Sequence, residues 1–218
     1  MSQVLLVRHG QASWGAEDYD VLSGRGVEQS AVLGAALAAR GLEPTVLVAG
    51  AMRRHHQTAS AAVEAAGWDV EVTTDEGWNE FDHLQVLSRH PAPEGVDVMS
   101  SPSVFQHWFA EATTRWTGGA YDDDYTEPFA SFTARVEGAL ARAAASVAGG
   151  GTAVVFTSGG PMGWAAASAL GGDAALWLRL NAVTVNTGVT KLVNGSRGLT
   201  LLTVNEHSHL PPDAVTYR

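Results

Sequence analysis

The stretch Val4-Leu5-Leu6-Val7-Arg8-His9-Gly10 decides the fold. Its run of branched apolar residues predicts a buried strand over residues 3–7, and the charged pair marks where the chain emerges. Ligands of open α/β sheets bind just beyond the carboxyl ends of the strands, so Arg8 and His9 are placed for chemistry. Arginine offers a forked, permanently charged set of donors, and histidine can be neutral and nucleophilic near pH 7. Gly10 allows a sharp turn close to a ligand.

Strands and helices alternate along much of the chain, which predicts an α/β fold with a mostly parallel sheet. Continuous apolar runs predict strands at residues 3–7, 45–48, 70–72, 153–157, 183–185, 189–193 and 199–204. Helical periodicity and helix-terminating glycines predict helices at residues 24–39, 52–66, 129–147 and 161–170. The turn Asn194-Gly195-Ser196 predicts that the last two strands form a hairpin.

Residues from about 75 to 128 interrupt this alternation. They contain Pro91, Pro93 and Pro102 and the acidic run Asp122-Asp123-Asp124, with a short helix expected near residues 104–112. We expect one domain over residues 1–218, with an insertion or cap at about 75–128 that lies over the active face.

Composition narrows the possible functions. The chain has 218 residues, a formal net charge of −10 and a single lysine, Lys191, which argues against non-specific nucleic-acid binding. It contains no cysteine, which excludes disulfides and thiolate catalysis. The sequence shows neither a signal peptide nor a long apolar span, so we expect a cytoplasmic protein without a membrane partner. The oligomeric state is not decided by the sequence, and a homodimer is compatible with it.

The run Leu5-Leu6-Val7-Arg8-His9-Gly10-Gln11-Ala12-Ser13 resembles the signature of the histidine phosphatase superfamily, which includes cofactor-dependent phosphoglycerate mutases and many small phosphatases. Further matching segments follow in order: Leu22-Ser23-x-x-Gly26-x-x-Gln29, Arg54-x-x-Gln57-Thr58, Trp78-Asn79-Glu80, and Asn205 through Leu210. The resemblance spans nearly the whole chain. It implies a three-layer α/β/α sandwich with a mostly parallel central sheet.

The resemblance also implies roles for individual residues. His9 is expected to attack phosphorus and form a phosphohistidine, with Arg8 and Arg54 neutralising the phosphoryl oxygens. Arg53 is a rival for the second arginine, but the four-residue interval to Thr58 selects Arg54. Further phosphate contacts are expected from Gln11, Ser13, Ser158 and Gly159.

Glu80 is the candidate general acid, which would protonate the leaving oxygen and then activate water. Glu76 and Asp82 lie close in the sequence and are alternatives, but the family's spacing favours Glu80.

Three places in the chain, four residues in all, depart from the family pattern. Where the family usually has His-Gly-Gly after a late strand, this chain has Ser158-Gly159-Gly160, and the sequence assigns no other histidine to that place. A serine donor carries no charge, so it would stabilise a phosphoryl group less strongly. Gly50-Ala51 replaces a more typical Ser-Pro, and Gly15 replaces an asparagine. The segment around Ser158 also lacks the glycine that precedes the nucleophilic serine in the elbow motif of serine hydrolases.

We therefore expect a phosphomonoester hydrolase that acts on a small phosphorylated metabolite. The alternative is a weak or inactive relative that binds phosphorylated ligands as a sensor or regulator. A phosphoglycerate mutase is less favoured, because Gly15 is not asparagine and the aromatic-basic motif of mutases is absent. We expect no cofactor and no metal, since His55-His56 and His207-x-His209 lack the spacing of known zinc sites.

Overall fold

The computed structural model describes residues 2–13, 20–92, 94–98, 100–196 and 198–217. The chain divides into two compact units, of which the first combines Met1–Glu80 with Val136–Arg218 and the second is Phe81–Arg135.

The first unit is built on a six-stranded sheet in the order β3-β2-β4-β1-β5-β6. The strands are β1 (Ser2–Arg8), β2 (Val46–Ala49), β3 (Val72–Thr74), β4 (Gly151–Thr157), β5 (Val189–Gly195) and β6 (Gly198–Glu206). The first four are mutually parallel, whereas β5 and β6 run antiparallel to their neighbours. This confirms the predicted α/β fold with a mostly parallel sheet, as well as the closing hairpin.

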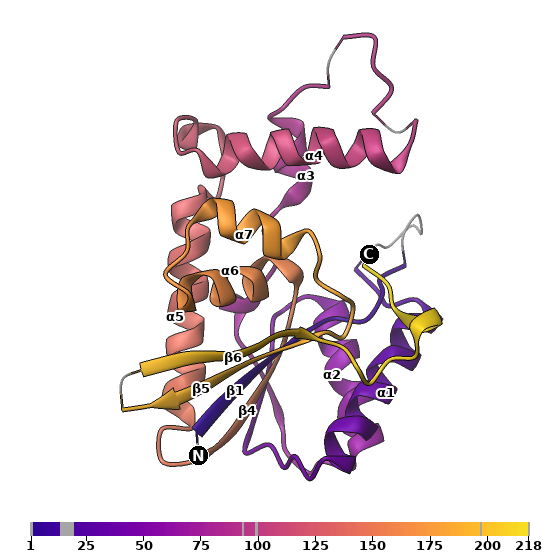
Figure 1. Ribbon diagram of the computed structural model, residues 1–218, viewed down its shortest axis with the longest axis vertical. Helices are drawn as coiled ribbons and strands as arrows, with labels where there is room; N and C mark the ends of the chain where they lie inside the picture. Colours follow the sequence, from indigo (N-terminus) through magenta and orange to yellow (C-terminus); the bar gives the residue numbers. More distant parts are fainter. Residues whose placement is uncertain (1, 14–19, 93, 99, 197, 218) are drawn as a thin grey trace. The chain divides into compact units, whose positions relative to one another are not determined.

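Helices pack on both faces of this sheet (Figure 1). The helices of the first unit are α1 (Gly24–Ala39), α2 (Arg53–Ala66), α6 (Gly159–Ala169), α7 (Ala174–Asn181) and the end of α5 (Phe129–Ser146). Helices α1 and α2 cover one face, and α6 with α7 lies over the other. The short 3-10 helices η1 (Glu76–Trp78) and η3 (Pro212–Ala214) belong to the loops.

Strand β1 is the centre of the core because both of its faces are covered. Leu5 and Val7 belong to the apolar cluster shared with α1 and α2, and Val4 and Leu6 are fully buried on the opposite face. Register pairs Arg8 of β1 with Thr157 of β4. The two central parallel strands therefore end side by side, which brings together the segments that follow them.

The helices that flank the sheet begin and end where local chemistry favours it. Ser23 caps α1 by accepting a hydrogen bond from the Gly26 amide at 3.1 Å. Gly67, in the left-handed conformation at φ 67°, ends α2. Both helices were predicted almost to the residue, because these signals are local.

Two expectations at the sheet were wrong. Residues 183–185 form a turn and irregular backbone rather than a strand, because the Val185 amide donates to the side chain of Asn205 in β6 at 2.8 Å and not to the backbone of a strand. The third strand lies at Val72–Thr74 instead of residues 70–72, in register with Leu47–Ala49.

Helix α7 was not predicted. It begins at the cap Asp173, whose carboxylate accepts from the amides of Ala175 and Leu176. Its Trp177 is fully buried.

The second unit consists of α3 (His83–Ser88), α4 (Pro102–Thr117), the 3-10 helix η2 (Asp122–Asp124) and the start of α5. The expected short helix lies within α4. Trp116 is the centre of an aromatic cluster, with ring centroids 4.8 Å from Phe81 and 5.1 Å from Phe129. Arg135 binds Glu127 through two hydrogen bonds of 2.7 and 2.8 Å.

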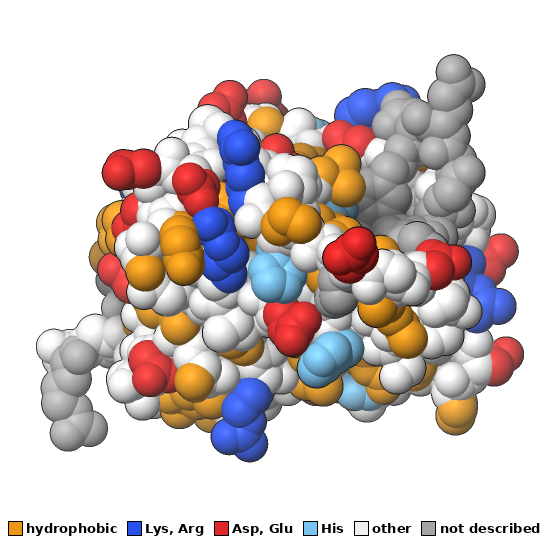
Figure 2. Space-filling model, turned by 90° about the horizontal axis from the view of Figure 1, so that it is seen from above, with side chains coloured by type: hydrophobic (Ala, Val, Ile, Leu, Met, Phe, Trp, Pro, Cys, Tyr) orange, Lys and Arg blue, Asp and Glu red, His pale blue; other side chains and the backbone are white. Residues whose placement is uncertain are grey.

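On the face shown in Figure 2, acidic and basic side chains are interspersed. Within the described part of the chain, no helix has the length and apolar character needed to cross a bilayer.

Candidate phosphoryl-transfer site

His9 lies directly after β1, at the point where the central strands end. Its backbone amide donates to the Thr157 carbonyl of β4 at 2.8 Å, and its own carbonyl accepts from the Asn186 side chain at 3.1 Å. The residue is only 4% exposed. The backbone of His9 is therefore anchored on two sides without using either ring nitrogen.

The ring of His9 is set up as a neutral base. Nδ1 lies 2.7 Å from the carbonyl oxygen of Gly10, and because a carbonyl only accepts, Nδ1 must carry the proton. The lone pair is then on Nε2. Burial is the largest cause that lowers the pKa of His9 well below its usual 6.5, and nearby basic groups lower it further, namely Arg54, Arg8 and His55. Neutral imidazole with a free Nε2 lone pair is the nucleophilic form.

Helix α2 is tied to the turn after His9 by one threonine. The Thr58 hydroxyl donates to the Arg54 carbonyl at 2.7 Å and accepts from the Gly10 amide at 3.0 Å. The four-residue interval thus places Arg54 one turn before the residue that anchors the helix. Gln57 adds a second tie, since its side chain accepts from the Leu22 amide at 2.8 Å.

Arg54, rather than Arg53, turns its side chain into the site. Arg54 is 5% exposed, whereas Arg53 is exposed to solvent. An ion pair of 2.8 Å joins Arg54 to Asp20, whose other oxygen accepts from the Arg53 amide at 2.9 Å. Asp20 therefore caps the start of α2 and orients the buried guanidinium at the same time.

Arg8 reaches the site from the end of β1. Its guanidinium donates to the carbonyl of Thr184 and, at 2.9 Å, to the carbonyl of Tyr217 near the end of the chain. A Cβ placed on Gly159 would lie 3.7 Å from Arg8 Nε. Arg8 and the first amide of α6 are thus neighbours, and the guanidinium is positioned by backbone oxygens that carry no net charge.

Glu80 lies at the start of α6. One of its carboxylate oxygens accepts from the Gly160 amide at 3.1 Å, and the residue is half-buried. The preceding segment is fixed to the end of β4 and to the loop before α2: Trp78 O accepts from the Thr157 hydroxyl at 2.6 Å, and the Asn79 side chain accepts from the Ala51 amide at 2.7 Å. Its sequence rivals do not share this position, because Glu76 and Asp82 are exposed.

Ser158 contacts a histidine that the sequence did not assign to the site. Its hydroxyl and Nε2 of His55 form a hydrogen bond of 2.7 Å, and both residues are fully buried. The ring centroid of His55 lies 5.9 Å from that of His9. Burial, with Arg54 and His56, lowers the pKa of His55 well below 6.5. The sequence carried a signal for it, since a histidine follows Arg54 directly.

Two further predicted phosphate contacts lie in the turn after His9. Gln11 is held by its neighbours, because its amide donates to Gln29 at 2.9 Å and its side-chain oxygen accepts from the Ser23 hydroxyl at 3.2 Å. Ser13 donates its amide to the Val21 carbonyl at 2.8 Å. Gly15 lies outside the described residues.

The turn before β5 supports the site and was missed by the sequence reasoning. Thr187 has a left-handed backbone at φ 60° and donates its amide to the Arg8 carbonyl at 3.1 Å. Its hydroxyl also contacts His209, a partly buried residue whose pKa burial lowers to about 4. This strained turn holds the backbone of Arg8 and His9 from the far side.

The other histidines do not gather into a metal centre. Among the described residues, no group of three or more histidine, aspartate or glutamate side chains is arranged to hold a metal ion. His55 faces Ser158, whereas the adjacent His56 contacts the Thr74 hydroxyl at 3.3 Å.

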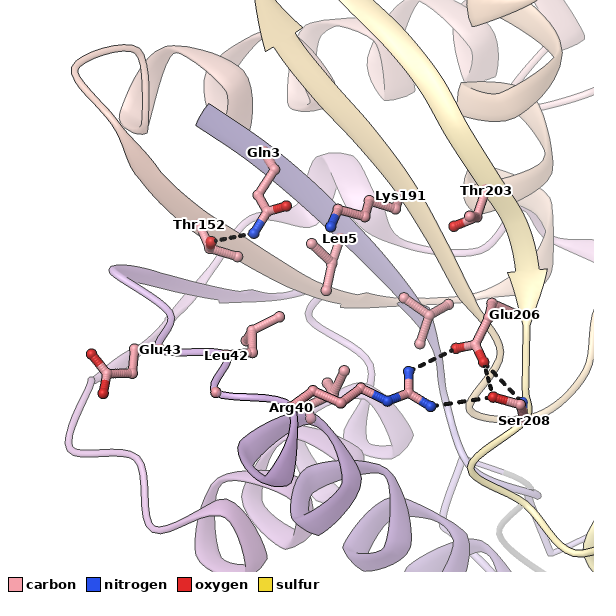
Figure 3. Close-up of a pocket in the computed structure, with 13 residues that line it drawn as sticks. Gln3, Leu5, Arg40, Leu42, Glu43, Thr152, Lys191, Thr203, Glu206 and Ser208 are labelled. Atoms are coloured by element: carbon pink, nitrogen blue, oxygen red, sulfur yellow. Dashed lines mark hydrogen bonds and ion pairs between the residues drawn. The ribbon is translucent and has the colours of Figure 1, made fainter. Parts of the chain in front are cut away.

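A hollow of about 590 Å³ also opens elsewhere in the first unit (Figure 3). It is lined by Gln3, at the opposite end of β1 from His9, and by Lys191 of β5. Arg40 crosses its edge and pairs with Glu206 at 3.4 Å. None of the predicted site residues lines it, so the chemistry expected of His9 belongs to the other edge of the sheet.

Solved structures with the same fold are known from several organisms. The chain is similar to a phosphoserine phosphatase mutant from Entamoeba histolytica in complex with phosphoserine, with 17% identity, coverage of 97% of this chain and 100% of that one, and a TM-score of 0.69. It is also similar to phosphoglycerate mutase from Bacillus anthracis str. Sterne, with 17% identity, coverage of 95% and 94%, and a TM-score of 0.68. A third is a putative alpha-ribazole-5′-P phosphatase from Escherichia coli str. K-12 substr. MG1655, with 18% identity, coverage of 94% and 97%, and a TM-score of 0.66.

No curated protein matches the chain in sequence. The sequence profile of the histidine phosphatase superfamily (branch 1), however, matches residues 4–207, which include every predicted site residue. The chain therefore belongs to the histidine phosphatase superfamily, branch 1.

Proposed function

We propose that this protein is a phosphomonoester hydrolase that acts through a phosphohistidine formed on His9. The observation that carries the proposal is the state of His9: a buried, neutral ring with its Nε2 lone pair available, beside Arg8 and Arg54. A nucleophile flanked by two guanidinium groups suits the transfer of a phosphoryl group, because such transfer depends mainly on positioning and electrostatics.

In the proposed reaction, Nε2 of His9 attacks phosphorus as the bond to the leaving oxygen breaks. Glu80 gives that oxygen a proton, and its carboxylate then takes a proton from the water that hydrolyses the phosphohistidine. Arg8, Arg54 and the amide of Gly159 at the start of α6 bind the phosphoryl oxygens.

The substrate class is a small phosphorylated metabolite. The similar solved structures support a phosphomonoester in general terms, since one contains phosphoserine and another is named for an alpha-ribazole phosphate. We propose that the insertion at about 75–128 acts as the cap that sets specificity, because binding loops on a rigid scaffold commonly do so.

The decisive experiment begins with a hydrolysis screen across sugar phosphates, nucleotides and phosphoamino acids. The best substrate, with a labelled phosphoryl group, is then mixed with the protein, and the phosphoprotein is isolated without acid. We expect released phosphate and a base-stable, acid-labile label on His9. Binding of phosphorylated ligands without label or release would contradict the hydrolase and support the alternative of a sensor.

That alternative rests on one feature, the serine at position 158. We propose that Ser158 stands where the superfamily usually has its second histidine. An uncharged donor at this place, taken alone, would raise the barrier by about 3 kcal/mol, by analogy with the loss of an oxyanion donor.

Replacing Glu80 with glutamine tests the general acid. We expect Glu80→Gln to slow hydrolysis of an alkyl phosphate about 100-fold or more, and of an aryl phosphate much less, because an aryl leaving group needs little protonation. The measurement is kcat on the two esters, with Glu76→Gln, an exposed neighbour, as the control. Equal losses on both esters would assign the acid to another group.

A further inference from the structure

We propose that His55 is a positioning residue of the phosphoryl site: it takes up a proton when a phosphate dianion binds and acts on that anion through the hydroxyl of Ser158. This inference rests on the proposed function and names the group that supplies the positive charge that a serine lacks. His55 and Ser158 are 103 residues apart in the sequence, so only the fold brings them together.

The placement of Ser158 supports a contact with the anion. Ser158 follows β4 as His9 follows β1, and the two strands are paired up to Arg8 and Thr157. Ser158 stands at the cap position of α6, yet its side chain makes no capping hydrogen bond. Its hydroxyl is bound to His55 instead, and the His55 ring centroid lies 5.9 Å from that of His9.

The absence of a side chain at Gly50 leaves space for the His55 ring. A Cβ placed on Gly50 would lie 2.3 Å from Nδ1 of His55 and 3.0 Å from the Trp78 carbonyl. Any larger residue at position 50 would therefore push the ring away from Ser158. Gly50, His55 and Ser158 fit together as a set.

The chemistry follows from the donors that each group offers. A serine hydroxyl accepts one hydrogen bond while donating another, so it can pass on the polarising effect of a charged ring. When an anion arrives, Nε2–H of the protonated His55 would donate to Ser158 Oγ, and the serine hydrogen would donate to an anion oxygen. One proton moves from solvent to the ring, and His55 makes no bond to phosphorus.

The charges around His55 explain why the anion is needed. Arg54 and His56 lie on its own helix, and His9 faces it from the end of β1. Arg54 and His56, together with burial, oppose a positive ring in the free protein. A bound dianion reverses the local field and makes protonation favourable.

Four variants separate this role from simple packing. His55→Gln can still bond to Ser158 but cannot carry charge, so we expect kcat on an aryl phosphate to fall at least 10-fold with a smaller change in KM. In Ser158→His alone, the new side chain should clash with the buried His55 ring, and we expect kcat to fall as far as in His55→Gln. The double variant His55→Ala/Ser158→His moves the imidazole across the vacated space, and it should recover most of the wild-type kcat. His56→Ala, the matched neighbour that contacts Thr74, should not lower kcat, because the group that it removes only opposes a positive His55 ring.

Calorimetry with sulfate provides a readout that needs no turnover. Sulfate is a dianion that exchanges no proton near pH 6.5, so binding measured in buffers of different ionisation enthalpy counts the protons that the protein takes up. Wild type and His56→Ala should take up more protons than His55→Gln, with a difference approaching one.

The outcomes keep the two proposals apart. A wild type that takes up the extra proton without hydrolysing any ester would overturn the hydrolase and leave the role of His55 standing. Equal proton uptake in wild type and His55→Gln, or wild-type kcat in His55→Gln, would overturn the role of His55 alone. A well-folded double variant as slow as His55→Gln would do the same.

Discussion

Substitution of His9 by alanine is expected to lower kcat by about four orders of magnitude or more on any phosphomonoester that the protein hydrolyses. The nucleophile cannot be replaced by the neighbouring His55, because that ring already binds Ser158. Water would have to attack directly in a pocket arranged for a fixed imidazole.

The fold should survive this change. The His9 ring bonds to the carbonyl of its own neighbour Gly10, while the amide and carbonyl that anchor the residue to Thr157 and Asn186 are retained in alanine. Unfolding curves and steady-state kinetics of His9→Ala would be compared with those of His56→Ala. Turnover by a folded His9→Ala protein at more than about 1% of the wild-type rate would remove His9 from the nucleophilic role.

Much of the fold was predictable because its signals are local. The helical periodicity after Gly24 and the glycine that follows the helix predicted residues 24–39, which are the bounds of α1 in the structure. The apolar run before Arg8 gave β1 within one residue at each end. In both cases neighbouring residues alone determine the conformation, so the rest of the chain did not need to be known.

The errors arose where distant contacts override local preference. Val183-Thr184-Val185 has strand propensity, but its backbone is bonded to Asn205, which is twenty residues away in sequence. The segment is thereby kept in a turn and irregular backbone that present the Thr184 carbonyl to Arg8. Helix α7 was missed because its local signal is ambiguous: a short apolar run is compatible with a helix as well as with a strand.

The candidate site divides in the same way. The proximity of Arg8, His9 and Arg54 was predictable because each lies next to a strong sequence pattern. The pairing of His55 with Ser158 depends instead on the packing of α2 against the end of β4. The sequence indicated only that Ser158 stands where the family usually has a histidine that can carry charge. The structure shows instead a serine whose hydroxyl is occupied by a buried imidazole.

The site also depends on one close backbone contact, and replacing Gly26 with alanine tests it. A Cβ on Gly26 would lie 2.1 Å from the Gln11 carbonyl oxygen and 2.8 Å from its amide nitrogen. Both atoms belong to the backbone just after His9, so they cannot move away without displacing the nucleophile's turn. We expect Gly26→Ala to lower the free energy of unfolding by about 3 kcal/mol, with a fall in Tm of roughly 6–12 °C for a chain of this length.

Gly24→Ala, on the same helix, is the matched control. A Cβ there meets nothing within 4 Å, so the exposed alanine should be neutral or stabilising by up to about 1 kcal/mol. Thermal unfolding of the two variants, with kcat measured well below the lower Tm, separates stability from geometry. Gly26→Ala should remain slower than wild type even when fully folded, because the contact that it breaks positions Gly10 and His9. A Gly26→Ala protein with the stability and kcat of Gly24→Ala would mean that α1 can shift away from Gln11 at no cost, and the close packing of these two backbones would then have no part in holding the site.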